Sequence, residues 1–173
     1  QASGLTIPGW RDVPSDNSRL GDIAKSSEPA IRQIFLKGDG LEGDALERRL
    51  FLARKRAEHA IREQVTAKPE DFYVCTMSAR TICYKGMFLS PQLMAYYPDL
   101  SNRDVVSAMA IIHQRYSTNT FPSWPLAQPF RMIAHNGEIN TLRGNKSRLS
   151  AAERSMQCPD LADDLSDLFP IIE

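Results

Sequence analysis

The sequence lacks any apolar run close to the roughly 20 residues that a transmembrane helix requires. It also lacks an N-terminal segment with the basic, apolar and small-residue order of a signal peptide. These two absences argue against a membrane or secreted protein and predict a soluble, cytoplasmic one. The chain begins at Gln1 rather than at Met, so we expect it to be a piece of a longer polypeptide.

An excess of charge of either sign is missing as well. The 173 residues carry 21 basic and 21 acidic side chains, so their formal charges cancel. This balance argues against nucleic acid or an anionic membrane as the main partner. The length fits one domain with a sizeable core, and we expect residues 1–173 to form part of a single domain.

Cysteine is scarce and shows no Cys-x-x-Cys spacing. The three positions are Cys75, Cys83 and Cys158. An odd count suits a reducing compartment better than a disulfide framework, so we expect free thiols. The three histidines have neither i, i+4 spacing nor Cys or carboxylate partners at metal-ligand intervals, and we expect no metal site. These histidines are His59, His113 and His135.

Hydrophobic periodicity predicts a long amphipathic helix over residues 44–65. Its basic side chains are interpreted as a solvated face rather than a nucleic-acid stripe. They include Arg48, Arg49, Lys55, Arg56 and Arg62. A short helix is expected over 90–97, stopped by Pro98. Another is expected beyond Thr141, with Leu149, Ala152 and Met156 on one side.

Short strands are predicted at residues 4–7 and 30–36, and two alternating runs predict a hairpin over 72–88. The stretch 108–116 fits either a helix or a buried strand, and its short length favours a strand. A further strand is expected over 131–135, after a proline-rich loop. Because strands and helices mix without regular β-α alternation, the pattern indicates an α+β fold.

The peptide IAHNGEIN at 133–140 contains Asn136-Gly137, a dipeptide typical of two-residue hairpin turns. Taken alone, it predicts a turn. The preceding segment HQRYSTNTFPSWPLAQPFR makes a functional site a stronger alternative to a simple turn. An arginine followed by Tyr-Ser-Thr-Asn and a long loop with proline and tryptophan is unusual for a loop that only joins two elements. At this point both interpretations of Asn136-Gly137 remain open: a hairpin turn, or a pair of hydrogen-bond donors aimed at an oxyanion.

Residues 113–145, HQRYSTNTFPSWPLAQPFRMIAHNGEINTLRGN, resemble a glutamine amidotransferase domain with an N-terminal cysteine nucleophile, as found in the large subunit of glutamate synthase. YKGMF at 84–88 and YYPDL at 96–100 are similar to that family too, and GWRDVP at 9–14 less strongly. The resemblance implies a four-layer αββα sandwich of the N-terminal-nucleophile hydrolase type. This chain would form only part of that sandwich.

The resemblance implies hydrolysis of L-glutamine to glutamate and ammonia. The Asn136 side-chain amide and the Gly137 backbone N–H would form the oxyanion hole, which stabilises the tetrahedral intermediate. Arg115 would grip the α-carboxylate of glutamine with its guanidinium fork. Thr118 and Glu138 are further substrate-binding candidates.

The proline-rich loop resembles a mobile loop that folds over bound glutamine and excludes water. Its candidate residues are Asn119, Phe121 and Trp124. The alternative is a proline-stiffened surface loop. Trp124, between Pro122 and Pro125, fits either a lid residue or a packing anchor.

Two parts of the family's active site are absent from this chain. The nucleophile is an N-terminal cysteine whose own α-amine accepts the proton, and neither Gln1 nor an internal cysteine meets that requirement. The family's ammonium-reading aspartate would follow Glu173. We expect the aspartates before it to lie on a solvated helix face and the chain to be inactive alone. These aspartates are Asp160, Asp163, Asp164 and Asp167.

By the same resemblance, the parent protein passes ammonia to a distant site where 2-oxoglutarate is reductively aminated. FMN and an iron–sulfur cluster are expected in those remaining domains and not in this one. Electrons would come from a small subunit or from ferredoxin. Two other hypotheses are a non-catalytic glutamine-binding or regulatory module, and a free-standing hydrolase that uses Cys75 or Cys83 with His113.

Overall fold

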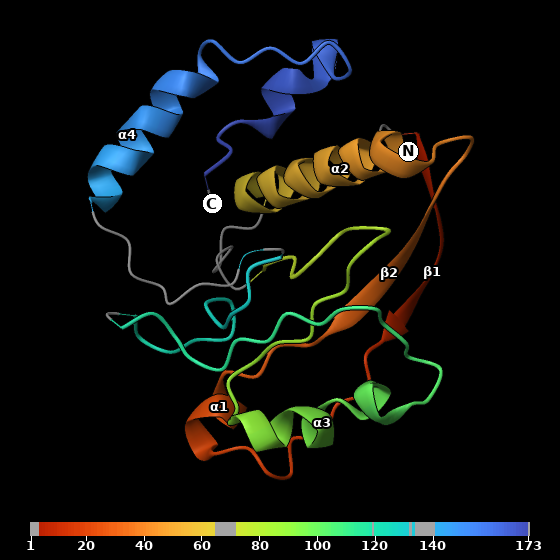
Figure 1. Cartoon of the computed structure of the whole chain (residues 1–173), viewed down its shortest axis with the longest axis vertical. Helices are drawn as coiled ribbons and strands as arrows, with labels where there is room; N and C mark the ends of the chain where they lie inside the picture. Colours follow the sequence, from red (N-terminus) through yellow and green to blue (C-terminus); the bar gives the residue numbers. More distant parts are fainter. Residues whose placement is uncertain (1–3, 65–71, 119, 132, 134–140, 173) are drawn as a thin grey trace. The chain divides into compact units, whose positions relative to one another are not determined.

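The computed structural model describes residues 4–64, 72–118, 120–131, 133 and 141–172 (Figure 1). The chain divides into two compact units. The first unit comprises Gln1–Leu5, Gly38–Ala79 and Ile139–Glu173. The second unit comprises Thr6–Lys37 and Arg80–Glu138. Within the described ranges, no helix is both long and apolar enough to cross a bilayer.

The elements follow in the order β1, α1, β2, α2, η2, α3, η3, α4 and η4, where η denotes a 3-10 helix. The two strands are β1 (Leu5–Asp12) and β2 (Arg32–Gly38). The α-helices are α1 (Asp22–Ser26), α2 (Gly43–Gln64), α3 (Leu93–Tyr96) and α4 (Leu142–Glu153). The 3-10 helices are η2 (Ser90–Gln92), η3 (Pro98–Ser101) and η4 (Ala162–Leu168).

Strands β1 and β2 form a two-stranded antiparallel sheet and lie side by side in Figure 1. Both predicted strands are thus confirmed, although β1 runs five residues beyond its expected end. It continues through Pro8 because a strand with only one neighbour has an edge where a missing N–H costs no ladder bond. The mixture of helices with antiparallel strands is confirmed, and the described residues form this one sheet.

Helix α2 confirms the long predicted helix, but the prediction of a solvated basic face is wrong for Lys55 and Arg56, whereas Arg62 is exposed. Arg54 is 3% exposed and Lys55 is 0% exposed. The Lys55 Nζ donates a 2.7 Å hydrogen bond to the Pro170 carbonyl, and the Arg54 guanidinium lies 3.0 Å from a Glu58 carboxylate oxygen. Charge counting along the helix could not reveal these partners, since the first of them lies more than 100 residues away.

The C-terminal part of the first unit packs beside α2 (Figure 1). The Asp164 carboxylate accepts hydrogen bonds from Arg49 at 2.7 Å and from Arg56 at 2.8 Å. Arg56 also bonds Asp167 at 2.7 Å. The prediction that these two aspartates lie on a solvated helix face is therefore wrong. A hydrophobic cluster accompanies the ion pairs, formed by Leu52, Leu161 and Leu168.

The predicted hairpin over residues 72–88 is wrong, because the described backbone there contains no strand. The Ala79 N–H donates instead to the Glu47 carboxylate at 2.8 Å. The Lys85 carbonyl accepts from the Tyr97 hydroxyl at 2.7 Å. Alternation predicts extended backbone but does not supply a strand partner, and here side chains satisfy these backbone groups.

The predicted strand over 108–116 is also wrong, since that stretch has no regular structure. Its apolar side chains are largely exposed, with Met109 at 76% and Ile112 at 78%. Burial drives strand formation in such a sequence, and the sheet that the described residues form, β1 with β2, does not pair with this stretch. The strand expected over 131–135 falls partly outside the described residues. Of the described ones, Phe130 and Ile133 form an isolated antiparallel bridge.

Aromatic side chains form the core of the second unit. The Tyr96 ring lies 4.7 Å from that of Tyr97, 5.2 Å from Phe88 and 5.5 Å from Trp124, measured between ring centroids. The short helix that the sequence predicts over 90–97 is confirmed as η2 followed by α3. It places Tyr96 and Tyr97 in this core.

One carboxylate joins three of the sequence motifs. Asp99 of YYPDL forms an ion pair with Arg11 of GWRDVP and accepts a 3.0 Å hydrogen bond from the Tyr84 hydroxyl of YKGMF. Burial, followed by the bond to Asp99, raises the pKa of Tyr84. The motifs that carry the family resemblance outside residues 113–145 thus hold the second unit together.

The predicted helix beyond Thr141 is confirmed as α4, whose residues are mostly exposed. Leu149 and Ala152 lie within it, and Met156 lies beyond its end. Cys75, Cys83 and Cys158 all lie in the described part of the chain, and none of them is in a disulfide, in agreement with the prediction of reduced cysteines.

Candidate functional site

The second unit contains a cavity of about 110 Å³. Three segments line it: residues from 84–93, the stretch 111–116, and 127–129. They come from YKGMF and the turn after it, from the approach to the RYSTN motif, and from the LAQPF motif. Segments that are far apart in the sequence therefore meet around one space, and two of them belong to the block 113–145.

Arg115 lines this cavity and is exposed. Its backbone N–H donates to the His113 Nδ1 at 3.3 Å, so the half-buried imidazole fixes the local backbone. A guanidinium presents paired N–H donors in a rigid fork that matches a carboxylate. The cavity can therefore hold an anionic ligand group at Arg115.

Tyr116 connects the start of the proline-rich loop to its middle. Its hydroxyl donates a 3.0 Å hydrogen bond to the Ser123 carbonyl. Burial raises the pKa of Tyr116 to about 12, so the phenol stays protonated and remains a donor at neutral pH. This bond holds Tyr116 and Ser123 close together.

Lys85 fixes the returning part of the same loop. Its Nζ donates to the Pro125 carbonyl at 2.7 Å and to the Ala127 carbonyl at 2.9 Å. The ammonium also lies 4.8 Å from the centroid of the Phe130 ring, within cation–π range. Lys85 is 6% exposed, so these bonds form in a largely dry environment where they are strong.

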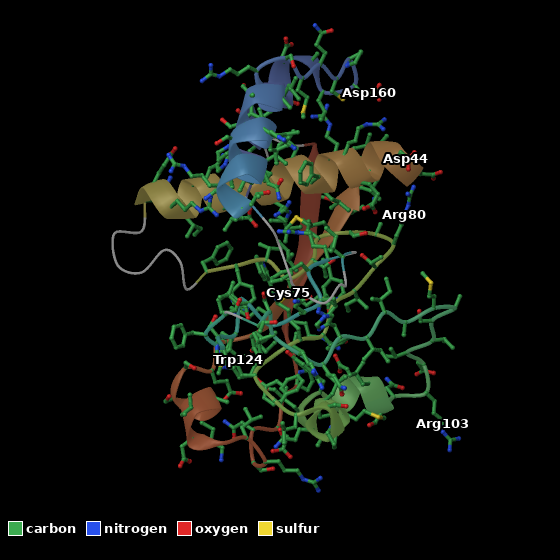
Figure 2. All side chains as sticks on the ribbon, turned by 60° about the vertical axis from the view of Figure 1, so that its left-hand side comes forward. Asp44, Cys75, Arg80, Arg103, Trp124 and Asp160 are labelled. Carbon is green, nitrogen blue, oxygen red and sulfur yellow. The ribbon has the colours of Figure 1, made fainter. Side chains whose placement is uncertain are left out.

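Trp124 is a packing anchor in this structure. It is 2% exposed, and its Nε1 donates a 3.0 Å hydrogen bond to the Ala24 carbonyl. Figure 2 shows the Trp124 side chain among its neighbours, whereas Arg103, on the chain beyond η3, projects outward. Phe121, three residues before Trp124, is 92% exposed. The loop therefore has a fixed second half and an exposed tip.

Among the described residues, no group of three or more His, Cys, Asp or Glu side chains could hold a metal ion. His113 lines the cavity and contacts the backbone of Arg115. His59 is half-buried on α2, and its Nε2 has no hydrogen-bond partner within the described part of the chain. His135 lies outside the described residues.

The family model described as glutamine amidotransferases class-II matches residues 1–173. The chain belongs to the class-II glutamine amidotransferases. The resemblance recognised in residues 113–145 is thereby confirmed at the level of the family. The aromatic core and the Asp99 contacts explain why YKGMF and YYPDL accompany that block.

Curated relatives of this amidotransferase chain are glutamate synthases. The NADPH-dependent large chain of Azospirillum brasilense is 48% identical over 173 residues, which cover 99% of this chain and 11% of that protein. An NADH glutamate synthase of Schizosaccharomyces pombe is 46% identical over 177 residues, covering 98% of this chain and 8% of the relative. A ferredoxin-dependent glutamate synthase of Synechocystis is 45% identical over 170 residues, covering 97% and 10%. The chain thus spans about a tenth of these relatives.

The structure places some of the predicted amidotransferase site residues and not others. Arg115 lines the cavity, while Thr118 is exposed and does not line it. Four predicted residues lie outside the described residues, so their convergence with Arg115 stays a prediction. These are Asn119, Asn136, Gly137 and Glu138.

Sequence reasoning missed two residues of the cavity wall, Lys85 and Gln128. Both stand inside motifs that carry the resemblance, YKGMF and LAQPF, and this was the only available signal. A lysine in a sequence is expected to be solvated, and a glutamine in a proline-rich loop has no distinctive spacing. Their importance depends on tertiary contacts that spacing does not encode.

Proposed function

We propose that this chain supplies the glutamine-binding part of a glutaminase active site, in which L-glutamine is hydrolysed to glutamate and ammonia. The observation that carries the proposal is the position of Arg115 on the wall of a cavity in the second unit that this family block lines. Family membership and the identity to glutamate synthases support it. Thr118 and Glu138 are proposed as further substrate contacts.

The geometry explains what Arg115 can do. Among the described residues that line the cavity, Arg115 and Lys85 are the cationic ones, and none is an aspartate or a glutamate. The Lys85 ammonium is directed at backbone carbonyls and the Phe130 ring, so Arg115 is the cation suited to a ligand. A glutamine α-carboxylate would bind its guanidinium bidentately.

The residues proposed to catalyse the hydrolysis lie around this binding site. Asn136 and the backbone N–H of Gly137 are proposed as the oxyanion hole, and an N-terminal cysteine as the nucleophile that attacks the side-chain amide. The exposed tip of the loop, with Asn119 and Phe121, would cover bound glutamine, and Trp124 would hold the base of that loop in place. Exclusion of water would favour transfer of ammonia over its escape.

We further propose that the natural protein is a cytoplasmic glutamate synthase in which ammonia reaches a distant site for reductive amination of 2-oxoglutarate. The reaction at that site would use FMN and an iron–sulfur cluster, and among the described residues of this chain no group of three or more His, Cys, Asp or Glu side chains could ligate such a cluster. These groups are assigned to the remaining domains. An electron-donating subunit or ferredoxin is the proposed partner.

The four-layer αββα sandwich is proposed for the complete domain, of which residues 1–173 form part. The exposed apolar stretch 105–112 supports this proposal, since Val106 is 86% exposed and Met109 is 76% exposed. Side chains of this kind are expected inside a sheet layer when neighbouring strands are present.

The test is glutaminase kinetics on the full natural protein that contains this chain. Arg115→Ala should raise KM for glutamine about 10- to 100-fold, the effect of losing a hydrogen-bonded charge pair. Arg115→Lys should recover only part of this loss, because lysine keeps the charge without the fork. Asn136→Ala should lower kcat by about 10²- to 10³-fold. An unchanged KM in Arg115→Ala would contradict the assignment of the binding site.

A further inference from the structure

The imidazole of His113 lies beside the backbone of Arg115 in the wall of the cavity. Its Nδ1 accepts a 3.3 Å hydrogen bond from the Arg115 N–H, and both residues line the cavity. An imidazole nitrogen that accepts a hydrogen bond carries no proton, so the neutral ring has its proton on Nε2. His113 therefore acts on Arg115 through the backbone and not through the guanidinium.

Side-chain bonds determine the course of the backbone around Arg115. Residues 108–116 have no regular secondary structure, so neither a helix nor a strand ladder sets the direction of their side chains. On one side of Arg115, His113 holds the N–H group. On the other side, the Tyr116 hydroxyl donates to the Ser123 carbonyl at 3.0 Å. The His113 bond joins a side chain to the N–H two residues later, which is the connectivity of an Asx-turn.

The guanidinium of Arg115 stands at the end of a long, exposed side chain. Such a side chain has many rotamers, and a ligand that binds it must immobilise it, which opposes binding. A backbone that is already fixed beneath the side chain removes part of this cost before the ligand arrives. A residue that fixes the backbone of Arg115 can therefore raise the affinity for a carboxylate without touching it.

We propose that His113 is a positioning residue for Arg115. The hydrogen bond to its Nδ1 keeps the guanidinium fork directed at the α-carboxylate of glutamine. This inference rests on the proposed function and deepens it, because it names the residue that orients the carboxylate-binding arginine. His113 takes no part in the chemical step, so loss of its acceptor weakens binding of the carboxylate and leaves the rate of that step as it is.

The experiment measures glutaminase KM and kcat on the full natural protein. The two substrates are L-glutamine and L-glutaminamide, which lacks the α-carboxylate. His113→Leu removes the acceptor and should raise KM for glutamine about 3- to 10-fold, the usual effect of losing one hydrogen bond. It should leave kcat, and KM for glutaminamide, within about twofold of the wild-type values, because neither depends on a bound carboxylate.

His113→Asn is the conservative variant. Asn and Leu have nearly the same shape, but the Asn Oδ1 can accept from the N–H two residues later, so this variant should keep KM for glutamine within about twofold of the wild-type value. His113→Ala is a second variant without an acceptor, and it should reproduce the loss seen in His113→Leu. His59→Leu is the matched control, because His59 is also half-buried but lies on α2 and does not line the cavity. That control should leave KM for glutamine unchanged.

The double variant His113→Leu, Arg115→Ala tests whether His113 acts through Arg115. Its KM for glutamine should match that of Arg115→Ala alone, because no guanidinium is left to direct. A further rise in the double variant would show that His113 acts independently and would overturn the inference.

Three other outcomes would also overturn it. They are an unchanged KM for glutamine in both His113→Leu and His113→Ala, equal impairment of His113→Leu and His113→Asn, and equal losses for the two substrates. Arg115→Ala separates these failures from failure of the proposed function. A raised KM in Arg115→Ala, with none in His113→Leu, would contradict only the role of His113. If Arg115→Ala leaves KM for glutamine unchanged, the binding site itself is misassigned.

Discussion

The ammonium of Lys85 lies 2.7 Å from the carbonyl oxygen of Pro125 and 2.9 Å from that of Ala127. One buried side chain thus holds two backbone groups that are two residues apart, directly before Gln128. This contact connects YKGMF to the LAQPF motif and sets one wall of the Arg115 cavity.

Lys85→Met is expected to loosen this wall. Loss of the ammonium leaves the two carbonyls without this donor, which should cost roughly 1–3 kcal/mol of local stability. Hydrogen exchange measured over residues 123–130 should accelerate, and KM for glutamine should rise. Lys146→Met is the control, because Lys146 is exposed on α4. Exchange rates that match those of the control would show that Lys85 does not hold the loop.

Gly86 sits where the aromatic core leaves no room for a side chain. A Cβ atom there would lie 2.5 Å from Phe88 Cε1 and 2.5 Å from Trp124 Cζ3. Gly86→Ala should therefore destabilise the second unit by roughly 1–3 kcal/mol through overpacking. A Cβ at Gly9 meets nothing within 4 Å, so Gly9→Ala is the matched control. Equal thermal midpoints for the two variants would contradict the packing described for this core.

Trp124 and Phe121 should respond differently to substitution. Trp124→Phe removes the donor to the Ala24 carbonyl and should lower stability by roughly 1 kcal/mol or more. Phe121→Ala removes a ring that is 92% exposed and should change stability by less than about 0.5 kcal/mol. If the tip covers bound glutamine, Phe121→Ala should also raise KM. Denaturation and kinetics on both variants would separate the anchor from the lid.

Asp164 gives the first unit a pH-dependent contribution to stability. The Arg49 hydrogen bond, followed by that of Arg56, holds the pKa of Asp164 below its usual value of 3.8. A carboxylate whose folded pKa is lowered stabilises the fold above its unfolded pKa, and this stabilisation is lost as the pH falls through the folded pKa. Asp164→Asn should thus lower the thermal midpoint at pH 7, and the difference from wild type should shrink below about pH 4.

Asp163→Asn is the control for this pH dependence. Asp163 is exposed, and the described part of the chain gives it no ion pair. Its substitution should leave the thermal midpoint nearly unchanged at both pH values. A difference for Asp164→Asn that persists undiminished at acidic pH would contradict the ion-pair explanation.

A helix could be predicted from the sequence where its apolar residues recur at a regular helical spacing. The helix expected over 44–65 appears as Gly43–Gln64, because apolar residues at three- and four-residue steps are a strong signal for a helix. The stretch 108–116 has equally apolar residues, but a strand also needs a partner strand. Neither β1 nor β2 pairs with this stretch, so the prediction failed there.

The environment of charged side chains could not be predicted. Lys55, Arg56 and Asp164 were all interpreted as solvated, yet each binds a partner more than 100 residues away. The residues of the candidate site also differ in whether the sequence could predict them. Arg115 was found because its motif resembles a family, while Lys85 acts through contacts that only the folded chain brings together.

The central claim is that Arg115 recognises the α-carboxylate of glutamine. The most direct measurement is the ratio of glutaminase KM values for L-glutaminamide, which lacks that carboxylate, and L-glutamine, determined for the wild-type natural protein and for Arg115→Ala. The account predicts a ratio of about 10 or more for the wild type, which falls to about 1 in the variant. An equal preference for glutamine in both proteins would contradict it.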